Sequence, residues 1–229
     1  MGGEVDEATW VLIEEERTSL ADLLATLTDD QWQTPSLCAE WRVRDVAAHV
    51  AMTPVAEPSL GGLLTALVAN RGHLWAAGRD VAIAYAQRPT DQLVTELRST
   101  ASLRTKPVFV WAPNILLDLV VHGQDSAVPL GITRRVPPPA GRTSLRRLWN
   151  MGWPFHARRR WGELSIRADD CDWSAGQGPL LTGSAADLLL LMTGRSVAVH
   201  RFLGPGVEVV RRRVVPPNHH ARDKEQRQP

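Results

Sequence analysis

The chain has 229 residues, of which 44% are hydrophobic and 22% are charged. This length and composition suit one large or two small globular domains, and they exclude a disordered or collagen-like chain. The net charge is only +1, but it is divided unevenly. Residues 1–130 carry nine Lys and Arg against 17 Asp and Glu, whereas residues 131–229 carry 17 against eight. The split predicts two units with different surfaces.

Cysteine content and hydropathy give an expectation of where the protein resides. The two cysteines, Cys38 and Cys171, are too few for a disulfide framework and suit a reducing compartment. The first residues are acidic and lack the basic-then-apolar order of a signal peptide. No stretch approaches the ~18 apolar residues of a membrane helix. We therefore expect a soluble, cytoplasmic protein without a membrane partner.

Apolar residues in the first half recur at helical spacing. They predict a long helix over residues 4–27, in which Glu14, Glu15, Glu16 and Arg17 lie between apolar positions. Thr28 is suited to cap the next helix. Further helices are expected at residues 43–50, 60–86, from about 93 onward, and 114–124. Long helices joined by short polar turns are typical of an antiparallel helical bundle.

The pattern changes after about Ile132. Pro137–Pro139 are expected to form an irregular linker before a short helix over residues 144–153. Residues 164–168 and 180–183 read as strands, and Ser184 caps a helix over residues 185–193. We therefore expect a bundle over residues 1–135, a small α+β domain over residues 136–215, and a disordered tail over residues 216–229.

The helix predicted over residues 114–124 carries a pair of polar residues on a strongly apolar background. Asp118 and His122 are four residues apart and therefore lie on one helix face, which is a spacing used by metal ligands. Burial of a carboxylate without a partner is costly, so a charged or hydrogen-bonding partner is expected for Asp118. His49 is a second imidazole on another apolar helix.

Two histidines and one carboxylate would leave positions on a metal open, as in catalytic sites. The alternative is simpler: Asp118 and His122 form a hydrogen-bonded pair, and His49 is a satisfied core residue. Spacing alone leaves both interpretations open. Asp125, which follows His122 by three residues, is interpreted as a cap or turn residue rather than as a group that orients His122.

Other reactive residues have weaker patterns. Cys38 has no neighbouring base or cation in the sequence to lower its pKa, so a buried structural thiol is expected. The arginine runs 158–160 and 211–213 lack interleaved aromatics, which favours solvated faces over a nucleic-acid interface. The sequence contains no phosphate-binding loop, no dinucleotide fingerprint and no serine nucleophile elbow.

Three stretches resemble one known family. Residues 35–50, PSLCAEWRVRDVAAHV, resemble the N-terminal signature of the mycothiol-dependent maleylpyruvate isomerase family, a member of the DinB-like group of metal-binding four-helix bundles. Residues 121–125, VHGQD, resemble its second signature. Residues 181–188 and 193–195 are similar to its smaller α+β domain. The implied fold class is α+β: a DinB-like antiparallel four-helix bundle followed by a small α+β domain.

The resemblance also implies a site. It assigns His49, Asp118 and His122 as ligands of a divalent metal, with zinc as the expected ion. The isomerase is similar in using two histidines and a glutamate, whereas this chain has Asp118 at the glutamate position. The shorter side chain puts the maleylpyruvate reaction itself in question.

The chemistry implied by the resemblance is thiol addition. A metal with open positions binds the thiol mycothiol as a thiolate, which then adds to an electrophilic carbon of a small substrate. The expected function is a mycothiol-dependent isomerase or thiol S-transferase. One alternative is a non-catalytic metal-bearing bundle that binds a protein or small ligand. Another is a carrier of hydrophobic ligands, because the small domain resembles sterol-carrier folds.

Overall fold

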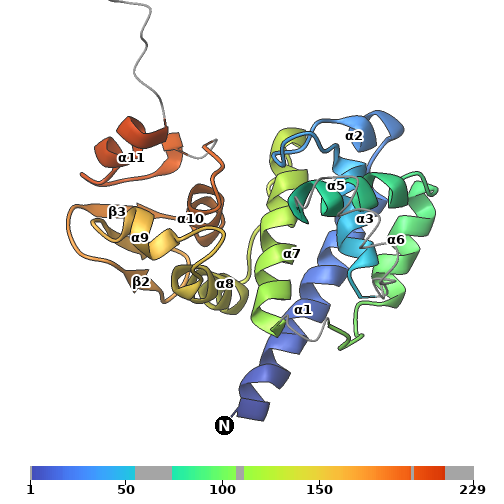
Figure 1. Ribbon diagram of the computed structural model, residues 1–229, viewed down its shortest axis with the longest axis horizontal. Helices are drawn as coiled ribbons and strands as arrows, with labels where there is room; N and C mark the ends of the chain where they lie inside the picture. Colours follow the sequence, from blue (N-terminus) through green and yellow to red (C-terminus); the bar gives the residue numbers. More distant parts are fainter. Residues whose placement is uncertain (1, 55–73, 107–110, 197–198, 215–229) are drawn as a thin grey trace, which may run out of the picture. The chain divides into compact units, whose positions relative to one another are not determined.

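The computed structural model describes residues 2–54, 74–106, 111–196 and 199–214 (Figure 1). The chain divides into two compact units, Met1–Arg147 and Leu148–Pro229. The helix α8 (Pro138–Asn150) crosses this division, whereas the sequence placed a boundary after residue 135. The domain limits at residues 135 and 215 stay predictions, and the expected tail over residues 216–229 lies outside the described residues.

Four helices of the first unit form a bundle. In it, α1 and α3 each pack against both α6 and α7 (Figure 1). The four helices are α1 (Gly2–Ala25), α3 (Val43–Met52), α6 (Thr90–Ser99) and α7 (Ala112–Ala127). The helical order predicted from the apolar spacing is therefore confirmed for this unit.

Side-chain and backbone contacts fix the direction of two helix pairs. Asp22, near the end of α1, pairs with Arg98 in α6 at 2.7 Å. Glu7, near the start of α1, pairs with Arg104 beyond the end of α6, so the two helices are antiparallel. Likewise, His49 in α3 contacts Asp118, while the N–H of Leu37, before α3, donates to the carbonyl of Asp125. Residue numbers therefore rise along α3 in the direction in which they fall along α7, so these two helices are also antiparallel.

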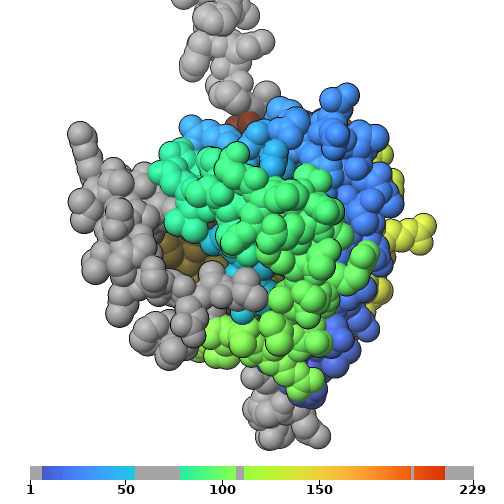
Figure 2. All heavy atoms as spheres, turned by 90° about the vertical axis from the view of Figure 1, so that its right-hand side faces the viewer, coloured from blue at the N-terminus to red at the C-terminus, as the bar shows by residue number. Residues whose placement is uncertain are grey.

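Shorter elements complete the first unit. Thr28 caps α2 (Asp29–Gln33) in a capping box, in which Gln31 donates to Thr28 Oγ1 and the Thr28 N–H donates to Gln31 Oε1. The helix α5 (Leu74–Tyr85) packs on α3 and confirms the end of the helix expected over residues 60–86. Residues 60–73 of that expectation lie outside the described residues. Figure 2 shows α5 and α6 covering this face, with only small parts of α3 visible between them.

The buried stripe of α1 includes two charged residues. Ile13, Leu20 and Leu24 are at most 1% exposed, as the periodicity predicts. Glu16 and Arg17, which lie between the apolar positions in the sequence, are also buried, at 2% and 1% exposure. Each has partners inside the bundle that offset part of the cost of burial.

Glu16 forms a buried ion pair with Arg134, which follows the short turn η1 (Val128–Leu130). Arg134 Nη2 donates to Glu16 Oε2 at 2.7 Å, and both side chains are at most 4% exposed. The guanidinium lies against Gly123 of α7: a Cβ there would be only 2.9 Å from Arg134 Nη1. The pair therefore ties α1 to the chain beyond α7 and lies against Gly123.

The prediction of an irregular linker at Pro137–Pro139 is wrong. Pro138 and Pro139 are instead the first residues of α8. Proline is tolerated in the first turn of a helix, because its missing N–H would have no intrahelical partner there and its φ is already helical.

The second unit is a small mixed α+β structure. Its three-stranded sheet has the order β2-β1-β3, with β1 antiparallel to β2 and parallel to β3. Ile166 pairs with Leu181 in the parallel register, and both are fully buried. The elements are α9 (Ala157–Trp161), β1 (Ser165–Ala168), β2 (Ser174–Ala175), β3 (Leu180–Gly183), α10 (Ala185–Met192), η2 (Val199–Arg201) and α11 (Val207–Val214).

Both strands expected from alternation and the helix capped by Ser184 are present. Ser184 Oγ accepts from the N–H of Asp187, as a helix N-cap does. The elements α9, β2 and α11 were not predicted, because each is short and the first and last are dominated by arginine. Across the described ranges, none of the helices has the length and hydropathy required to span a membrane.

The Glu16–Arg134 pair gives a first prediction. Replacing Arg134 by Met leaves the Glu16 carboxylate buried without its partner, which should lower the free energy of unfolding by about 3–5 kcal/mol. Urea denaturation of Arg134→Met and wild type measures this difference. Arg98→Met is the matched control, because Arg98 and Asp22 are more than half exposed and such pairs contribute at most about 1 kcal/mol. Equal loss of stability in the two variants would contradict the prediction.

Candidate metal centre

The structure brings together the three residues that were predicted as metal ligands. His49 comes from α3, and Asp118 and His122 come from successive turns of α7. Asp118 Oδ2 is 3.2 Å from His49 Nε2, and Asp118 Oδ1 is 3.3 Å from His122 Nε2. One donor atom from each residue lies within 4.8 Å of the other two. The carboxylate thus bridges two imidazoles that are 73 residues apart in the chain.

These separations suit a single small metal ion. Two ligand atoms bound to tetrahedral zinc at ~2.0–2.1 Å lie about 3.3 Å apart, close to both Asp118–histidine distances. Imidazole nitrogen and carboxylate oxygen are also ligand types that zinc prefers. The donor set therefore fits a divalent metal in both chemistry and spacing.

Exposure differs across the three residues. The His122 side chain is 12% exposed and that of His49 is 27% exposed, whereas Asp118 is 41% exposed. The carboxylate therefore marks the open side of the cluster. A ligand bound beside Asp118 can reach the same point as the imidazoles without entering the bundle core.

The three groups are strongly coupled electrostatically. Partial removal from water raises the pKa of Asp118, but the charges and hydrogen bonds of His122 and His49 outweigh this and hold that pKa well below its usual range. Burial lowers the pKa of His122, whereas Asp118 and Asp125 raise it to about 9. Without a metal, a proton on the imidazole balances the carboxylate. A bound cation would replace that proton.

Asp125 does not cap α7, contrary to the sequence interpretation. It lies inside the helix, is fully buried, and its Oδ2 is 3.0 Å from His122 Nδ1. A carboxylate at this distance accepts the Nδ1–H of the ring, so Nε2 faces Asp118 and becomes the metal-binding nitrogen once its proton is lost. The i, i+3 spacing from His122 was the available signal. Asp125 therefore orients His122 for binding.

Trp41 covers both imidazoles. Its ring centroid is 5.3 Å from that of His49 and 5.8 Å from that of His122, with a near-stacked angle of 28° to the latter. Trp41 is 9% exposed and packs with Val46 and Ala82 in a small apolar cluster. This packing limits rotation of the two rings. Trp41 lies within the family-like stretch of residues 35–50, but no spacing in the sequence indicates that it covers the histidines.

Cys38 lies beside this cluster. The sequence analysis expected a buried thiol, whereas Cys38 is only partly buried. It is partly exposed and packs against Trp41, Val46 and Ala82. Its sulfur, a nitrogen of His122 and an oxygen of Asp125 lie within 4.8 Å of one another and form a second group of possible metal ligands. However, the Asp125 carboxylate is already hydrogen-bonded to His122 Nδ1, so this second group competes for atoms that orient the imidazole. The His49–Asp118–His122 group is the better candidate.

Comparisons with known proteins identify a domain model and two solved structures that this chain resembles. Residues 13–102 match the mycothiol maleylpyruvate isomerase N-terminal domain. This range includes His49 and ends before Asp118 and His122. No curated protein matched the sequence. Crystal structures of the mycothiol-dependent maleylpyruvate isomerase and of a histidine-to-alanine mutant are similar, each with a TM-score of 0.51 and 16% identity.

Each of these structural matches covers 87% of this chain and 92% of the other. At 16% identity the likeness shows a shared fold, which confirms the α+β class with a DinB-like helical bundle and a smaller α+β part. Residues 13–102 of this chain therefore match the mycothiol maleylpyruvate isomerase N-terminal domain, and the chain has the fold of the mycothiol-dependent maleylpyruvate isomerase.

Proposed function

We propose that the chain is a mycothiol-dependent enzyme that binds a divalent metal, zinc being the expected ion, through His49, Asp118 and His122. The convergence of these three donors at the open side of α3 and α7 carries the proposal. Three protein ligands leave at least one coordination position for a small molecule, as in catalytic zinc sites. The match of residues 13–102 supports mycothiol as the thiol.

Asp118 in place of a glutamate is compatible with this role. Its carboxylate already reaches both histidines, at 3.2 and 3.3 Å, because α3 and α7 pack directly on each other. The shorter side chain therefore does not leave the donor set incomplete. It does place the donor oxygens closer to the α7 backbone than a glutamate side chain would.

The chemistry divides between a bound cation and the protein. A zinc ion held by His49, Asp118 and His122 would supply a Lewis acid that lowers the pKa of a bound thiol. The chain holds the donor atoms: Asp125 fixes the His122 tautomer, and Trp41 limits both imidazole rings. Asp118, the most exposed of the three donors, sets the side from which a thiol and an electrophile approach.

Isomerase and S-transferase activities share a first step. The thiolate sulfur forms a bond to an electrophilic alkene carbon, and the alkene electron pair moves to the adjacent activating group. In isomerisation, rotation about the new single bond is followed by return of that electron pair and release of the thiolate. In transfer, a proton adds to the neighbouring carbon and the thioether remains. The products distinguish the two reactions.

The metal site gives a direct prediction. Replacing His122 by Ala removes an imidazole ligand and leaves only His49 and Asp118 as donors. The zinc content at micromolar protein should therefore fall from about one ion per chain to near zero. Elemental analysis after dialysis against a buffered zinc solution measures the stoichiometry. His200→Ala is the matched control, since His200 lies in η2 of the second unit. Zinc retained by His122→Ala would contradict the assignment.

The role of Asp125 gives a second prediction. Asp125→Asn keeps the size of the side chain but weakens the hydrogen bond that fixes His122, so zinc affinity should fall about 10–100-fold. Competition against a chromophoric chelator gives the dissociation constants. Unchanged affinity in a folded Asp125→Asn protein would show that Asp125 does not orient the ligand.

Activity separates an enzyme from a non-catalytic metal-bearing bundle. The zinc-loaded protein should accelerate reaction of mycothiol with at least one member of a panel of activated alkenes, and His122→Ala should lose at least about 100-fold of that rate. Liquid chromatography with mass detection identifies isomer or thioether products. Stoichiometric zinc without acceleration across the panel would favour the binding protein.

A further inference from the structure

A second group of possible metal ligands lies beside the His122 ring. The sulfur of Cys38, a nitrogen of His122 and an oxygen of Asp125 all lie within 4.8 Å of one another. His122 Nε2 faces Asp118 at 3.3 Å, whereas Nδ1 faces Asp125 at 3.0 Å. The ring therefore presents a different nitrogen to each of its two acidic neighbours, and Asp125 belongs to the Cys38 group.

Hydrogen bonds of the loop before α3 place Cys38 beside Asp125. The N–H of Leu37 donates to the carbonyl of Asp125 at 3.1 Å, which joins the loop to α7 at that residue. The N–H of Cys38 donates to Ser36 Oγ at 3.1 Å, and the Cys38 carbonyl accepts from the N–H of Trp41, also at 3.1 Å. The backbone that carries the sulfur is thus fixed before an ion binds, which lowers the entropic cost of forming a site.

The three residues differ in their access to solvent. Cys38 is partly exposed, the His122 side chain is 12% exposed, and Asp125 is fully buried. A cation bound at Cys38 therefore lies next to a carboxylate that bulk water does not screen, which strengthens their attraction. The group thus offers an ion a way in at the sulfur and a buried charge beside it.

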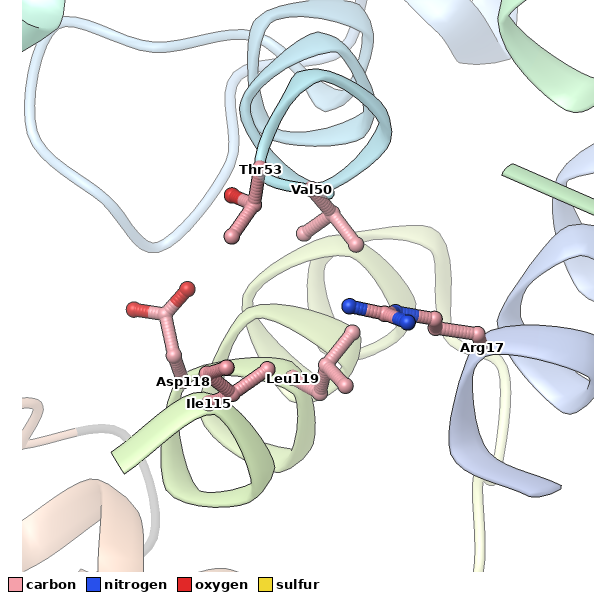
Figure 3. Close-up of a pocket in the computed structure, with 6 residues that line it drawn as sticks. All are labelled: Arg17, Val50, Thr53, Ile115, Asp118 and Leu119. Atoms are coloured by element: carbon pink, nitrogen blue, oxygen red, sulfur yellow. The ribbon is translucent and has the colours of Figure 1, made fainter. Parts of the chain in front are cut away.

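This position differs from the candidate zinc position. His49 and Asp118 belong to the first group of ligands, and the two groups share only His122. Figure 3 shows the space beside Asp118, which is lined by Arg17, Val50, Thr53, Ile115 and Leu119. Cys38 is not one of the described residues that line it. The Cys38 group is therefore a separate position and not an extension of the first.

The ligand types of the Cys38 group favour a soft cation. Thiolate sulfur is the softest ligand in the protein repertoire, whereas carboxylate oxygen is hard and imidazole is intermediate. One equivalent of zinc is expected at the first group, because binding there leaves the hydrogen bond between Asp125 and His122 intact. A softer ion such as Cd²⁺ gains more from the sulfur, which offsets the loss of that hydrogen bond.

Only one of the two positions can use the His122 ring at a time. A neutral imidazole has one nitrogen lone pair, and its other nitrogen carries the proton. A cation bound together with Asp125 takes Nδ1 and leaves the proton on Nε2, where Asp118 accepts it. Zinc at the first group requires the reverse, with the proton on Nδ1 and Asp125 as its acceptor.

We propose that Cys38, His122 and Asp125 form a second metal site, which takes a thiophilic cation such as Cd²⁺ in competition with zinc at the first. The competition rests on the proposed zinc centre, whereas the site itself does not. Cation binding releases the thiol proton of Cys38 and the Nδ1 proton of His122. The thiolate and the Asp125 carboxylate then balance the two charges of the cation.

Cadmium titration of the full chain tests the site, because a cadmium–thiolate bond gives an ultraviolet charge-transfer band. Wild type, stripped of metal and freed of chelator, should develop the band and reach a plateau. Cys38→Ser should lose the band, whereas Cys171→Ser should keep it. Cys171 is the matched control, since it lies between β1 and β2 of the second unit. No band in wild type, or an undiminished band in Cys38→Ser, would overturn the proposal.

Further variants show whether all three residues form the site. Asp125→Asn should raise the cadmium concentration at half of the full band by about 10–100-fold. Asp118→Asn and His49→Ala should not raise it, because these residues belong to the first group. Circular dichroism checks that each variant is folded. A wild-type midpoint in Asp125→Asn would show that Cys38 binds cadmium alone, and loss of the band in folded His49→Ala would place the sulfur in the first group. Either result would overturn the second site.

Zinc analysis separates this proposal from the first metal assignment. Cys38→Ser should retain one zinc per chain, and release of half of that zinc should need at least about tenfold more cadmium than in wild type. Equal release would overturn the competition. If wild type takes up no zinc but shows the Cys38-dependent band, the second site is supported and the proposed zinc enzyme fails. If zinc binds and the band is absent, the second site fails and the first stands.

Discussion

The contact between Asp118 and two imidazoles organises the functional end of this bundle. Asp118 and His122 share one face of α7, but His49 reaches them only because α3 packs antiparallel against α7. The carboxylate and the imidazoles stabilise each other's charges, and Asp125 and Trp41 hold the rings in place. Any loss of α3–α7 packing would separate the donors, so fold and site depend on the same interface.

Part of this arrangement could be predicted from the sequence, for simple reasons. The i, i+4 spacing of Asp118 and His122 fixes their relation within one helix. The placement of His49 beside them required the family resemblance, because His49 and Asp118 are 69 positions apart and no local pattern between them fixes the packing of α3 on α7. Asp125 was misinterpreted, since its i, i+3 relation to His122 is equally compatible with a turn after the helix.

The buried charges show where the sequence analysis could have gone further. Arg17 follows Ile13 by four residues and precedes Leu20 by three, so it falls on the apolar stripe of α1 and not beside it. That position was a usable signal of a buried guanidinium. The carbonyl oxygens of residues 100–103 that accept from Arg17 are brought to it by long-range packing, so no local sequence pattern predicts them. The same is true of the pairing of Glu16 with Arg134. The same holds for the two-residue strand β2.

The coordination of zinc in the loaded protein tests the central claim most directly. X-ray absorption at the zinc edge distinguishes nitrogen and oxygen ligands at about 2.0–2.1 Å from sulfur at about 2.3 Å. We predict two imidazole ligands, with oxygen from Asp118 and from solvent completing the shell, and no sulfur. A sulfur ligand contributed by Cys38, or a protein that takes up no zinc, would contradict the assignment of His49, Asp118 and His122.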